Sequence, residues 1–327
     1  MVNSTNKIDI SIIIVNYKSW KHLRNCLNSL QNLGDLSLVF EIIVVDNHSN
    51  DGNLETFSNE FSEAHFVLNS GNNGFANGCN FGASKAKGDY FLFLNPDTIT
   101  NGKAVEEIFH FAKLNRNVGI TSCLQKKASG GYEKSIRIFP NMITLFGLTR
   151  AIYKLFIKKQ LESEEVLYTD WVSGSLVFIS KQWFTQINGW NEDYWMYYED
   201  MDLSKKVQES NGKVALLKSV EIIHNHGGAS RLNIKTSVIT KTEVQISKHV
   251  YIQNNFKGIE RILSQFLLLI NNIIFKLLLA IFGILLFFIP KMRLNVYLFA
   301  RIISYYGSCL ANRNWLSKNS MNSNRKQ

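Results

Sequence analysis

The chain has 327 residues, of which 46% are hydrophobic and 19% are charged, with only three prolines and twenty glycines. Such a chain can bury a sizeable core, which excludes intrinsic disorder and collagen-like repeats. The formal charge of +10 is concentrated in residues 255–327, where ten Lys and Arg residues accompany a single acidic one, Glu260. The body is therefore nearly neutral, and we expect the basic tail to meet a membrane surface and no part of the chain to bind nucleic acid.

Two local features bear on the compartment. The first ten residues lack the apolar core of a signal peptide, so we expect the body to stay in the cytoplasm. The cysteines form no C-x-x-C pair and are interpreted as reduced, mostly buried thiols. They are Cys26, Cys79, Cys123 and Cys309.

Short apolar runs alternate with helical patterns through the first half of the chain. Strands are predicted at 10–15, 42–45 and 90–94, and helices at 20–30 and 104–114. Because the strands are continuously apolar, they indicate a central parallel sheet covered by helices on both faces, which is an α/β fold. In such a sheet, ligands gather beyond the carboxyl ends of the strands.

The pattern is less regular from residue 171 to residue 228, and we interpret this stretch as the second half of the same domain. The predicted organisation is one domain over 1–255 and a basic, apolar helical region over 256–327. In that region, residues 266–289 contain nineteen Leu, Ile or Phe among 24 positions. The longest uninterrupted apolar run, 277–289, is shorter than the roughly 20 residues needed to cross a bilayer. An interfacial or re-entrant hairpin suits it at least as well as one span, and a buried helical pair is the alternative.

Two polar clusters at predicted strand ends are candidates for ligand binding. The first begins at Asp46 and ends at Gly52, where a carboxylate could accept hydrogen bonds from a ribose or a base, although an ordinary turn explains the same residues. The second, 72–82, has glycines at every fourth position as it enters a helix. Free N–H groups there favour phosphate, and tight packing of the helix on the sheet is the alternative.

Two further clusters carry hard oxygen or imidazole donors. Asn95 and Asp97 follow the strand 90–94 and suit Mg²⁺ or Mn²⁺ holding a diphosphate, while capping of the next helix is the alternative. His224 and His226 follow another apolar run beside two glycines, where a histidine could ligate the metal or meet a phosphate.

The last cluster places three carboxylates within four residues, at Glu199, Asp200 and Asp202. Favourable interaction with a helix dipole requires one or two acids, so a surplus carboxylate is available to accept a proton from an attacking hydroxyl. The surrounding aromatic residues, which include Trp190 and Tyr198, could stack on a sugar or pack in the core.

Taken in order, these segments resemble the family 2 glycosyltransferases of GT-A fold. The resemblance covers roughly residues 9–231. It is carried by SIIIVNYKSW, VVDNHSNDG, NNGFANGCNFG, FLFLNPDT, WVSGSLVFIS, INGWNEDYWMYYEDMDL and HNHGGAS. Within the family, the chain is similar to the rhamnosyltransferases of bacterial O-antigen assembly, which share the LNPD motif and a Ser-x-Arg-x-Phe-Pro element, here beginning at Ser135.

The resemblance implies a Rossmann-like GT-A sheet with membrane-associated C-terminal helices, and it implies roles for particular residues. Asp200, with Glu199 beside it, matches the catalytic base. Asp97 matches the metal-binding aspartate of the family's D-x-D motif, with His226 as a second metal contact, and Asn95 replaces the first aspartate. The residues implied to bind the nucleotide sugar are Asn16, Asp46, Asn47, Asp51, Asn73, Gly74 and Asn95. Those implied to line the acceptor or sugar pocket are Trp171, Gly174, Trp190, Tyr198, Asp202 and His224.

The implied activity is inverting transfer of a sugar, L-rhamnose from dTDP-rhamnose, to a lipid-linked oligosaccharide acceptor in O-antigen or cell-surface polysaccharide synthesis. Mg²⁺ or Mn²⁺ is the implied cofactor, and the implied location is the cytoplasmic face of the inner membrane, peripheral or anchored by the C-terminal helices. Alternatives are transfer of another sugar (hexose, GlcNAc or galactofuranose), a nucleotidyltransferase, or a non-enzymatic membrane scaffold. A nucleotidyltransferase usually needs a glycine-rich, basic loop near its N-terminus, and residues 16–24 contain no glycine.

Overall fold

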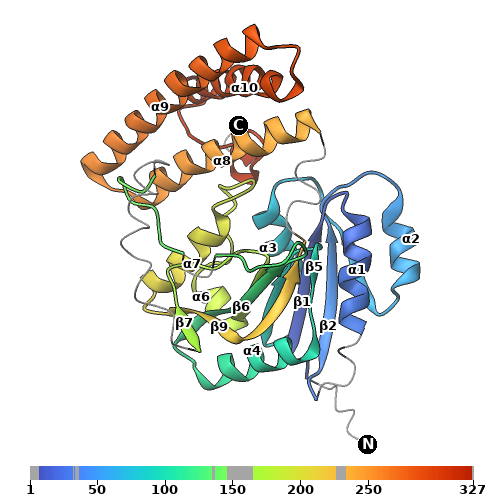
Figure 1. Cartoon of the computed structure of the whole chain (residues 1–327). Coiled ribbons are helices and arrows are strands. Elements are labelled where there is room, and N and C mark those ends of the chain that lie inside the picture. Colours follow the sequence, from blue (N-terminus) through green and yellow to red (C-terminus); the bar gives the residue numbers. More distant parts are fainter. Residues whose placement is uncertain are drawn as a thin grey trace, which may run out of the picture. The chain divides into compact units, whose positions relative to one another are not determined.

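The protein is described by a computed structural model that covers residues 7–31, 33, 37–134, 137–145, 165–225 and 233–325. The chain forms two compact units. Unit 1 comprises Met1–Phe139, Lys154–Asn191 and Glu199–Gly228, and unit 2 comprises Pro140–Tyr153, Glu192–Tyr198 and Ala229–Gln327. Figure 1 shows the elements of both units.

Within the described residues, unit 1 contains all nine strands and six of the helices. Its strands are β1 (Ile10–Asn16), β2 (Phe40–Asp46), β3 (Ala64–Leu68), β4 (Tyr90–Leu94), β5 (Thr98–Ile99), β6 (Val118–Lys127), β7 (Val166–Tyr168), β8 (Leu176–Ser180) and β9 (Lys213–His224). Its helices in the first 114 residues are α1 (Trp20–Gln31), α2 (Asn53–Glu60), α3 (Phe75–Lys85) and α4 (Gly102–Leu114). The later ones are α6 (Lys181–Gln186) and α7 (Glu199–Glu209). Helices α1 and α4 confirm the helices predicted at 20–30 and 104–114.

The strands form one sheet in the order β3-β2-β1-β4-β8-β6-β9-β5, with β7 on β9. From β3 to β4 all neighbours are parallel, and Asn16 at the end of β1 is the register partner of Asp46 at the end of β2. The polar residues after β1, β2 and β4 therefore share one edge of the sheet, as the sequence predicts.

The sheet is mixed where a parallel sheet was expected. Strand β8 runs antiparallel to both β4 and β6, and β9 is parallel to β6 but antiparallel to β5. An apolar run shows that a strand is covered on both faces, but it carries no information about strand direction. The second half of the sheet could therefore not be oriented from its composition.

Alternating side chains of the strands build two cores on opposite faces of the sheet. On one face, Ile12 and Ile14 pack with residues of α1, α2 and α4. On the other, Ile13 and Val15 pack with residues of α3, α6 and α7. All four cysteines are free, and three of them are buried, as predicted for most of them.

Within its described residues, unit 2 contains helices and turns and no strand. Its helices are α8 (Ile234–Asn255), α9 (Gly258–Leu285), α10 (Pro290–Asn312) and α11 (Met321–Arg325). Among the described helices, α9 alone has the length and apolarity of a membrane span. The structure groups α8 with the C-terminal helices, and the domain boundary after residue 255 stays a prediction.

Candidate active site

The loops after β1 and β2 are joined at the edge of the sheet. Asn16 is completely buried, and Asp46 is 3% exposed. The backbone N–H of Asn47 donates to the carbonyl of Asn16 at 2.7 Å, and Asp46 Oδ1 accepts the backbone N–H of Ser49 at 3.2 Å. Three residues of the loop, His48, Asn50 and Gly52, have φ values of 65°, 50° and 76°. These left-handed residues fold the turn tightly, so that Asp46 is held at the end of its strand.

A network of side-chain amides connects this loop to the start of α3. Asn69 donates to Asn47 Oδ1 at 2.8 Å and to Asn77 Oδ1 at 2.9 Å. Asn47 in turn donates to Asn72 Oδ1 at 3.1 Å and to the carbonyl of Gly74 at 3.2 Å. The network orients Asn47, and the sequence interpretation missed Asn69, whose only signal is its position directly after β3.

The predicted donor-binding residue Asp51 already has an internal partner. Its Oδ2 accepts the indole N–H of Trp20 at 2.8 Å. Burial raises the pKa of Asp51, but the hydrogen bonds from Trp20 and Asn53 outweigh this and lower it below its usual value. Asp51 is therefore an ionised side chain that ties the β2 loop to α1.

The glycine spacing over 72–82 is explained mainly by packing. A Cβ on Gly78 would lie 2.7 Å from Val15 Cγ1, and a Cβ on Gly82 would lie 2.5 Å from Ile13 Cγ2. Only glycine lets α3 approach β1 this closely. Gly74 differs, because it caps the N-terminus of α3 with a φ of 105°. Asn73 directly precedes this cap, where the first N–H groups of α3 lack intrahelical partners.

Asp97 forms part of a chain of charged groups. Its Oδ1 lies 3.3 Å from Nε2 of His224, and Nδ1 of His224 lies 2.8 Å from Glu133 Oε1. Glu133 Oε2 accepts the Arg137 guanidinium at 2.9 Å. Burial lowers the pKa of His224, but the hydrogen bonds and charges of Asp97 and Glu133 outweigh it and raise the pKa to about 9. His224, predicted for the sugar pocket, is 3% exposed and instead bridges two carboxylates.

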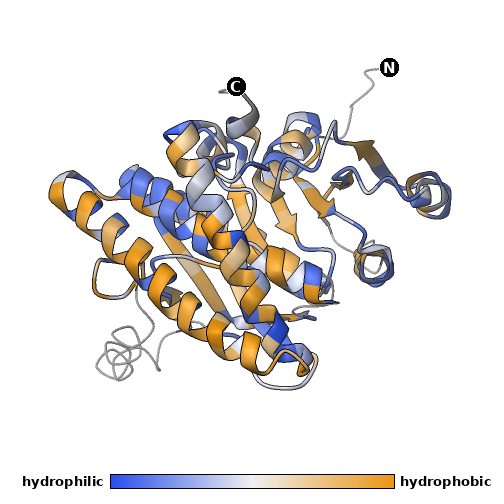
Figure 2. Ribbon diagram, turned by 90° about the horizontal axis from the view of Figure 1, so that it is seen from above, coloured by the Kyte–Doolittle hydropathy of each residue, from blue (hydrophilic) through white to orange (hydrophobic). Residues whose placement is uncertain are grey.

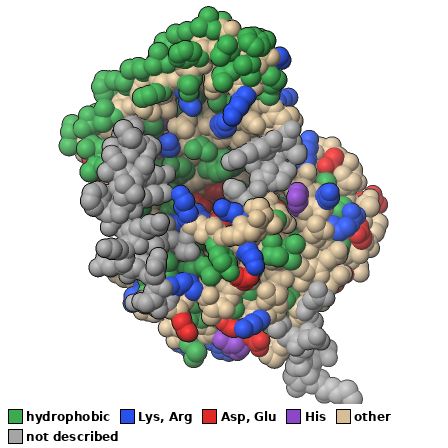
Figure 3. Space-filling model, viewed as in Figure 1, with side chains coloured by type: hydrophobic (Ala, Val, Ile, Leu, Met, Phe, Trp, Pro, Cys, Tyr) green, Lys and Arg blue, Asp and Glu red, His purple; other side chains and the backbone are tan. Residues whose placement is uncertain are grey.

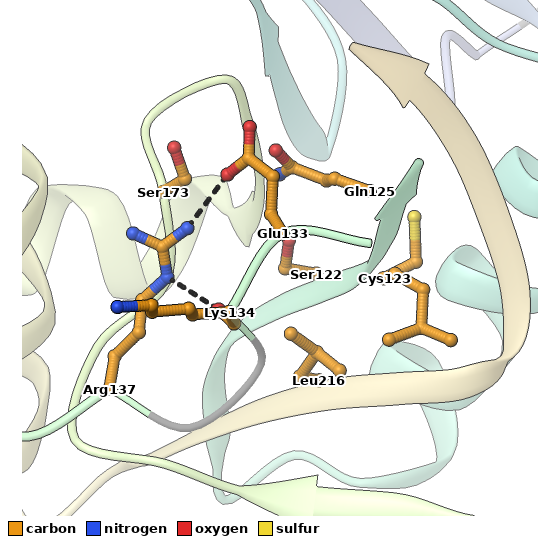
Figure 4. Close-up of a pocket in the computed structure, with 9 residues that line it drawn as sticks. Ser122, Cys123, Gln125, Glu133, Lys134, Arg137, Ser173 and Leu216 are labelled. Carbon is orange, nitrogen blue, oxygen red and sulfur yellow. Dashed lines mark hydrogen bonds and ion pairs between the residues drawn. The ribbon is translucent and has the colours of Figure 1, made fainter. Parts of the chain in front are cut away.

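Arg137 and Glu133 line a small cavity that Figure 4 shows in close-up. The cavity has a volume of about 10 Å³, which is room for roughly one water molecule. Ser173 also lines it. The Arg137 guanidinium covers the Trp171 ring at 4.6 Å from its centroid, and the Trp171 indole donates to a backbone carbonyl at 3.1 Å. Trp171, predicted for the sugar pocket, is thus fixed by Arg137 on one face.

Asp200 is the second residue of α7 and contacts the Trp-x-x-Gly-Ser segment. Its Oδ2 accepts the backbone N–H of Gly174 at 3.0 Å, and its Oδ1 accepts the N–H of Met201 at 2.8 Å. A Cβ on Gly174 would lie 3.4 Å from Asp200 Cβ, so a glycine permits the close approach. Burial raises the pKa of Asp200, and the Gly174 N–H and the charge of Arg137 partly oppose this rise.

Glu199 and Asp202 are more deeply buried than Asp200. They are 8% and 4% exposed. Burial, and then the neighbouring charge of Asp200, raise the pKa of Glu199 well above its usual value. Its Oε2 is buried without a hydrogen-bond partner among the described residues, which fits a neutral carboxyl. With Glu199 neutral, Asp200 can carry the negative charge of the pair.

The remaining predicted residues lie in different surroundings. Trp190 is 2% exposed and packs edge-on against Phe75 and Phe93, so it contributes to the core and offers no open face for a sugar. Tyr198 belongs to unit 2, where its ring lies 5.6 Å from that of Tyr251. The prediction for His226 falls outside the described residues.

Asn95 is held through its backbone. Its N–H donates to the carbonyl of Ser175 at 3.0 Å, and its carbonyl accepts the Thr98 hydroxyl at 2.7 Å. The bond to Ser175 joins the end of β4 to the segment that carries Gly174. No cluster of three or more His, Cys, Asp or Glu placed to hold a metal occurs in the described part of the chain.

Solved structures share this fold. Staphylococcus aureus TarS matches with a TM-score of 0.51 and 17% identity over 77% of this chain, but over only 41% of TarS. GalNAc-T7, solved with UDP, GalNAc and Mn²⁺, matches with a TM-score of 0.53 and 17% identity, over 76% of this chain and 51% of that one.

Curated relatives are glycosyltransferases by name. The low-salt glycan biosynthesis hexosyltransferase Agl10 of Haloferax volcanii is 26% identical over 228 residues, which are 68% of this chain and 69% of Agl10. The rhamnosyltransferase WbbL of Escherichia coli is 28% identical over 42% of this chain and 53% of WbbL. The N-acetylglucosaminyl-diphospho-decaprenol L-rhamnosyltransferase of Mycobacterium tuberculosis is 22% identical over 66% of this chain and 76% of the relative.

Two family models match the chain in succession. The model of the N-terminal domain of galactosyltransferase matches residues 163–226, which include Gly174, Asp200 and His224. The model of glycosyl transferase family 2 matches residues 11–175, half of the chain, from the first strand to the segment that contacts Asp200. The chain belongs to glycosyltransferase family 2 and is a glycosyltransferase of GT-A fold.

Proposed function

We propose that the protein is an inverting glycosyltransferase that moves L-rhamnose from dTDP-rhamnose to a lipid-linked saccharide in O-antigen or cell-surface polysaccharide synthesis. The observation that carries the proposal is the Asp200 carboxylate, which is fixed by the N–H of Gly174 at 3.0 Å beside Glu199, a carboxyl whose pKa is raised by burial. Two relatives named as rhamnosyltransferases support the sugar, and the decaprenol in one of their names supports a lipid-linked acceptor.

Asp200 is the base in this reaction. It accepts the proton of an acceptor hydroxyl while that oxygen forms a bond to the anomeric carbon and the bond from that carbon to the diphosphate breaks. Burial raises the pKa of Asp200, which makes its carboxylate a stronger base than one in water. Attack from the opposite face inverts the anomeric centre, so a β-linked donor gives an α-linked rhamnoside.

The donor would bind at the sheet edge formed by the loops after β1 and β2. Asp46, Asn16 and the amide of Asn47 lie together there and suit the ribose and base. Asn73 and Gly74 precede α3, whose free N–H groups suit a phosphate.

The residues after β4 fit a divalent cation that is held partly by the phosphates of the donor. Mg²⁺ is usually held by one or two carboxylates together with substrate phosphates, so Asp97 with Asn95 nearby would suffice as the protein's part. Such a cation would neutralise charge on the leaving diphosphate. The chain's own contribution is the His224 imidazole, held between Asp97 and Glu133, which orients the Asp97 carboxylate.

The enzyme would act at the cytoplasmic face of the membrane, where lipid-linked acceptors are available. The apolar helix α9 and the basic C-terminal region support this location. Transfer of another hexose is the second candidate, because the relative Agl10 is named a hexosyltransferase.

The test is release of nucleotide from a panel of nucleotide sugars with a lipid-linked acceptor. We expect dTDP-rhamnose to be the preferred donor, and preference for another donor would replace the sugar but keep the enzyme class. The same assay is run on Asp200→Asn. Its matched control is Asp89→Asn, because Asp89 has a 48% exposed side chain that pairs with Lys7 at the opposite end of β4. No turnover with any donor in the panel, by a folded protein, would contradict the proposal.

A further inference from the structure

We infer that α9 and α10 lie as a hairpin in the plane of an anionic membrane surface, and that α9 does not cross the bilayer although it is long enough to do so. The proposed function requires only membrane association and leaves this arrangement open. The inference rests on unit 2 alone and does not depend on the identity of the reaction.

The first observation is that α9 exposes many apolar side chains. Six Leu and Ile residues recur at spacings of three, four or seven along one stripe, and each is between 36% and 69% exposed. They are Leu263, Leu267, Ile274, Leu278, Ile281 and Leu285. Figure 2 shows α9 as hydrophobic along most of its length, and Figure 3 shows apolar side chains gathered over α9 and α10.

The opposite face of α9 is buried and includes the polar side chains Gln265 and Asn272. Gln265 donates to the backbone carbonyl of His249 in α8 at 2.9 Å. Asn272 donates to the Tyr306 hydroxyl in α10 at 3.0 Å, and that hydroxyl also lies 3.0 Å from His249 Nε2. A helix in water turns most of its polar side chains outward, whereas α9 buries Gln265 and Asn272 and exposes many Leu, Ile and Phe residues. Its exposed stripe therefore suits contact with acyl chains.

The second observation is that α10 runs back along α9. A Cβ on Gly283 would lie 2.7 Å from the Met292 carbonyl and 2.9 Å from Val296, near the turn between the helices. Asn272 meets Tyr306 eleven residues earlier in α9. The two helices therefore lie side by side over much of their length.

This pairing argues against a span. If α9 crossed the bilayer, the paired α10 would have to enter it as well. Helix α10 carries Arg293, Asn295 and Arg301, and within the described helices only α9 is apolar enough to cross. Charged side chains at the centre of a bilayer are strongly disfavoured.

Basic residues at both ends of α9 indicate that the membrane surface it contacts is anionic. Lys257 and Arg261 lie at its start, and Lys291 and Arg293 follow its end. Residues 233–325 contain twelve Lys and Arg but only two acidic residues. An in-plane helix lets both basic ends meet the same anionic headgroups, whereas a span would place one of them on the opposite side of the membrane.

Binding of the full chain to vesicles tests the partner. We expect tight binding to phosphatidylcholine vesicles that contain phosphatidylglycerol and weak binding to phosphatidylcholine alone. K291Q with R293Q should lower the partition coefficient by about fivefold per charge. L278E with I281E should lower it at least about tenfold. The control is L114E, since Leu114 is 83% exposed at the end of α4 and should not affect binding. Circular dichroism checks that each variant is folded.

Two results of that experiment would overturn the inference. One is equal binding to neutral and anionic vesicles. The other is a protein that stays in solution as a dimer which L278E with I281E dissociates, since a second copy of the chain would then cover α9.

Cysteine labelling tests the orientation. K257C and K291C are made separately together with C309S, which removes the one native cysteine that is partly exposed. The other three, Cys26, Cys79 and Cys123, are buried. Inverted membrane vesicles from cells that express the full chain are treated with an impermeant maleimide. Both cysteines should react from the same, outer side. Protection of either one until the vesicles are opened would show a span and refute the inference.

Discussion

Replacing Glu133 by Gln tests the chain of charges that joins Asp97 to the Asp200 side of the site. Glu133 receives Arg137 at 2.9 Å and lies 2.8 Å from Nδ1 of His224, and the Glu133 and Arg137 side chains are only 13% and 18% exposed. Gln preserves the shape but removes the charge that both neighbours face. Arg137 would then lose the carboxylate that it pairs with, and His224 would keep only Asp97 as a counter-charge, in a largely buried setting.

The cost follows from these two contacts. A hydrogen bond to a charged group contributes about 1.5–3 kcal/mol, and breaking a buried ion pair by removing one partner costs about 3–5 kcal/mol. Because Gln can still accept one hydrogen bond, we expect a loss of about 3 kcal/mol in the free energy of unfolding. We also expect kcat to fall at least about tenfold, since Arg137 and His224 would shift around Asp200 and Asp97.

The measurement is urea unfolding together with steady-state sugar transfer. The matched control is Glu209→Gln, because Lys205 and Glu209 form an ion pair of the same i,i+4 spacing with Glu209 64% exposed. That variant should lose no more than about 0.5 kcal/mol. Equal losses for the two variants, or an unchanged kcat in Glu133→Gln, would refute the reasoning.

Three further predictions concern packing, pH and metal. Gly82→Ala should cost about 1–3 kcal/mol in thermal unfolding because its Cβ would lie 2.5 Å from Ile13, and an unchanged melting temperature would contradict it. Burial, partly opposed by Ser317 and Arg301, raises the pKa of Glu243 to about 7. Between about pH 4.5 and 7 the unfolded chain therefore loses this proton first and stability falls by up to about 3 kcal/mol, which Glu243→Gln should abolish in urea unfolding at pH 5 and 7.5. Chelation should weaken donor binding in the wild type but not in Asp97→Asn, as measured by calorimetry, and equal weakening in both would remove Asp97 from any metal site.

Much of the fold was accessible from the sequence because its signals are local. The apolar runs that became β1, β2 and β4 end in polar residues, and that alone placed Asn16, Asp46 and Asn95 at one edge of a sheet. The direction of β8 was not accessible, since a strand buried on both faces reads the same in either orientation.

The site could be predicted only in part, because some of its residues carry a local signal and others are brought together only by the fold. Asp200 stood out because three acids at one helix start exceed what the helix dipole explains. Glu133 gave no signal, because it is a single acid whose partner His224 lies 91 residues away in sequence. Trp190 was ambiguous, since an aromatic side chain in a turn suits a sugar or a core equally, and only its packing against Phe93 decides between them.

The central claim is that Asp200 removes the proton from the acceptor hydroxyl. Single-turnover transfer from bound donor tests this most directly, with donor affinity measured on the same preparation. The account predicts that Asp200→Asn slows transfer by about 10²–10⁴-fold and leaves donor affinity within a factor of about two. Transfer at a rate close to the wild type, by a folded Asp200→Asn protein with the donor bound, would contradict it.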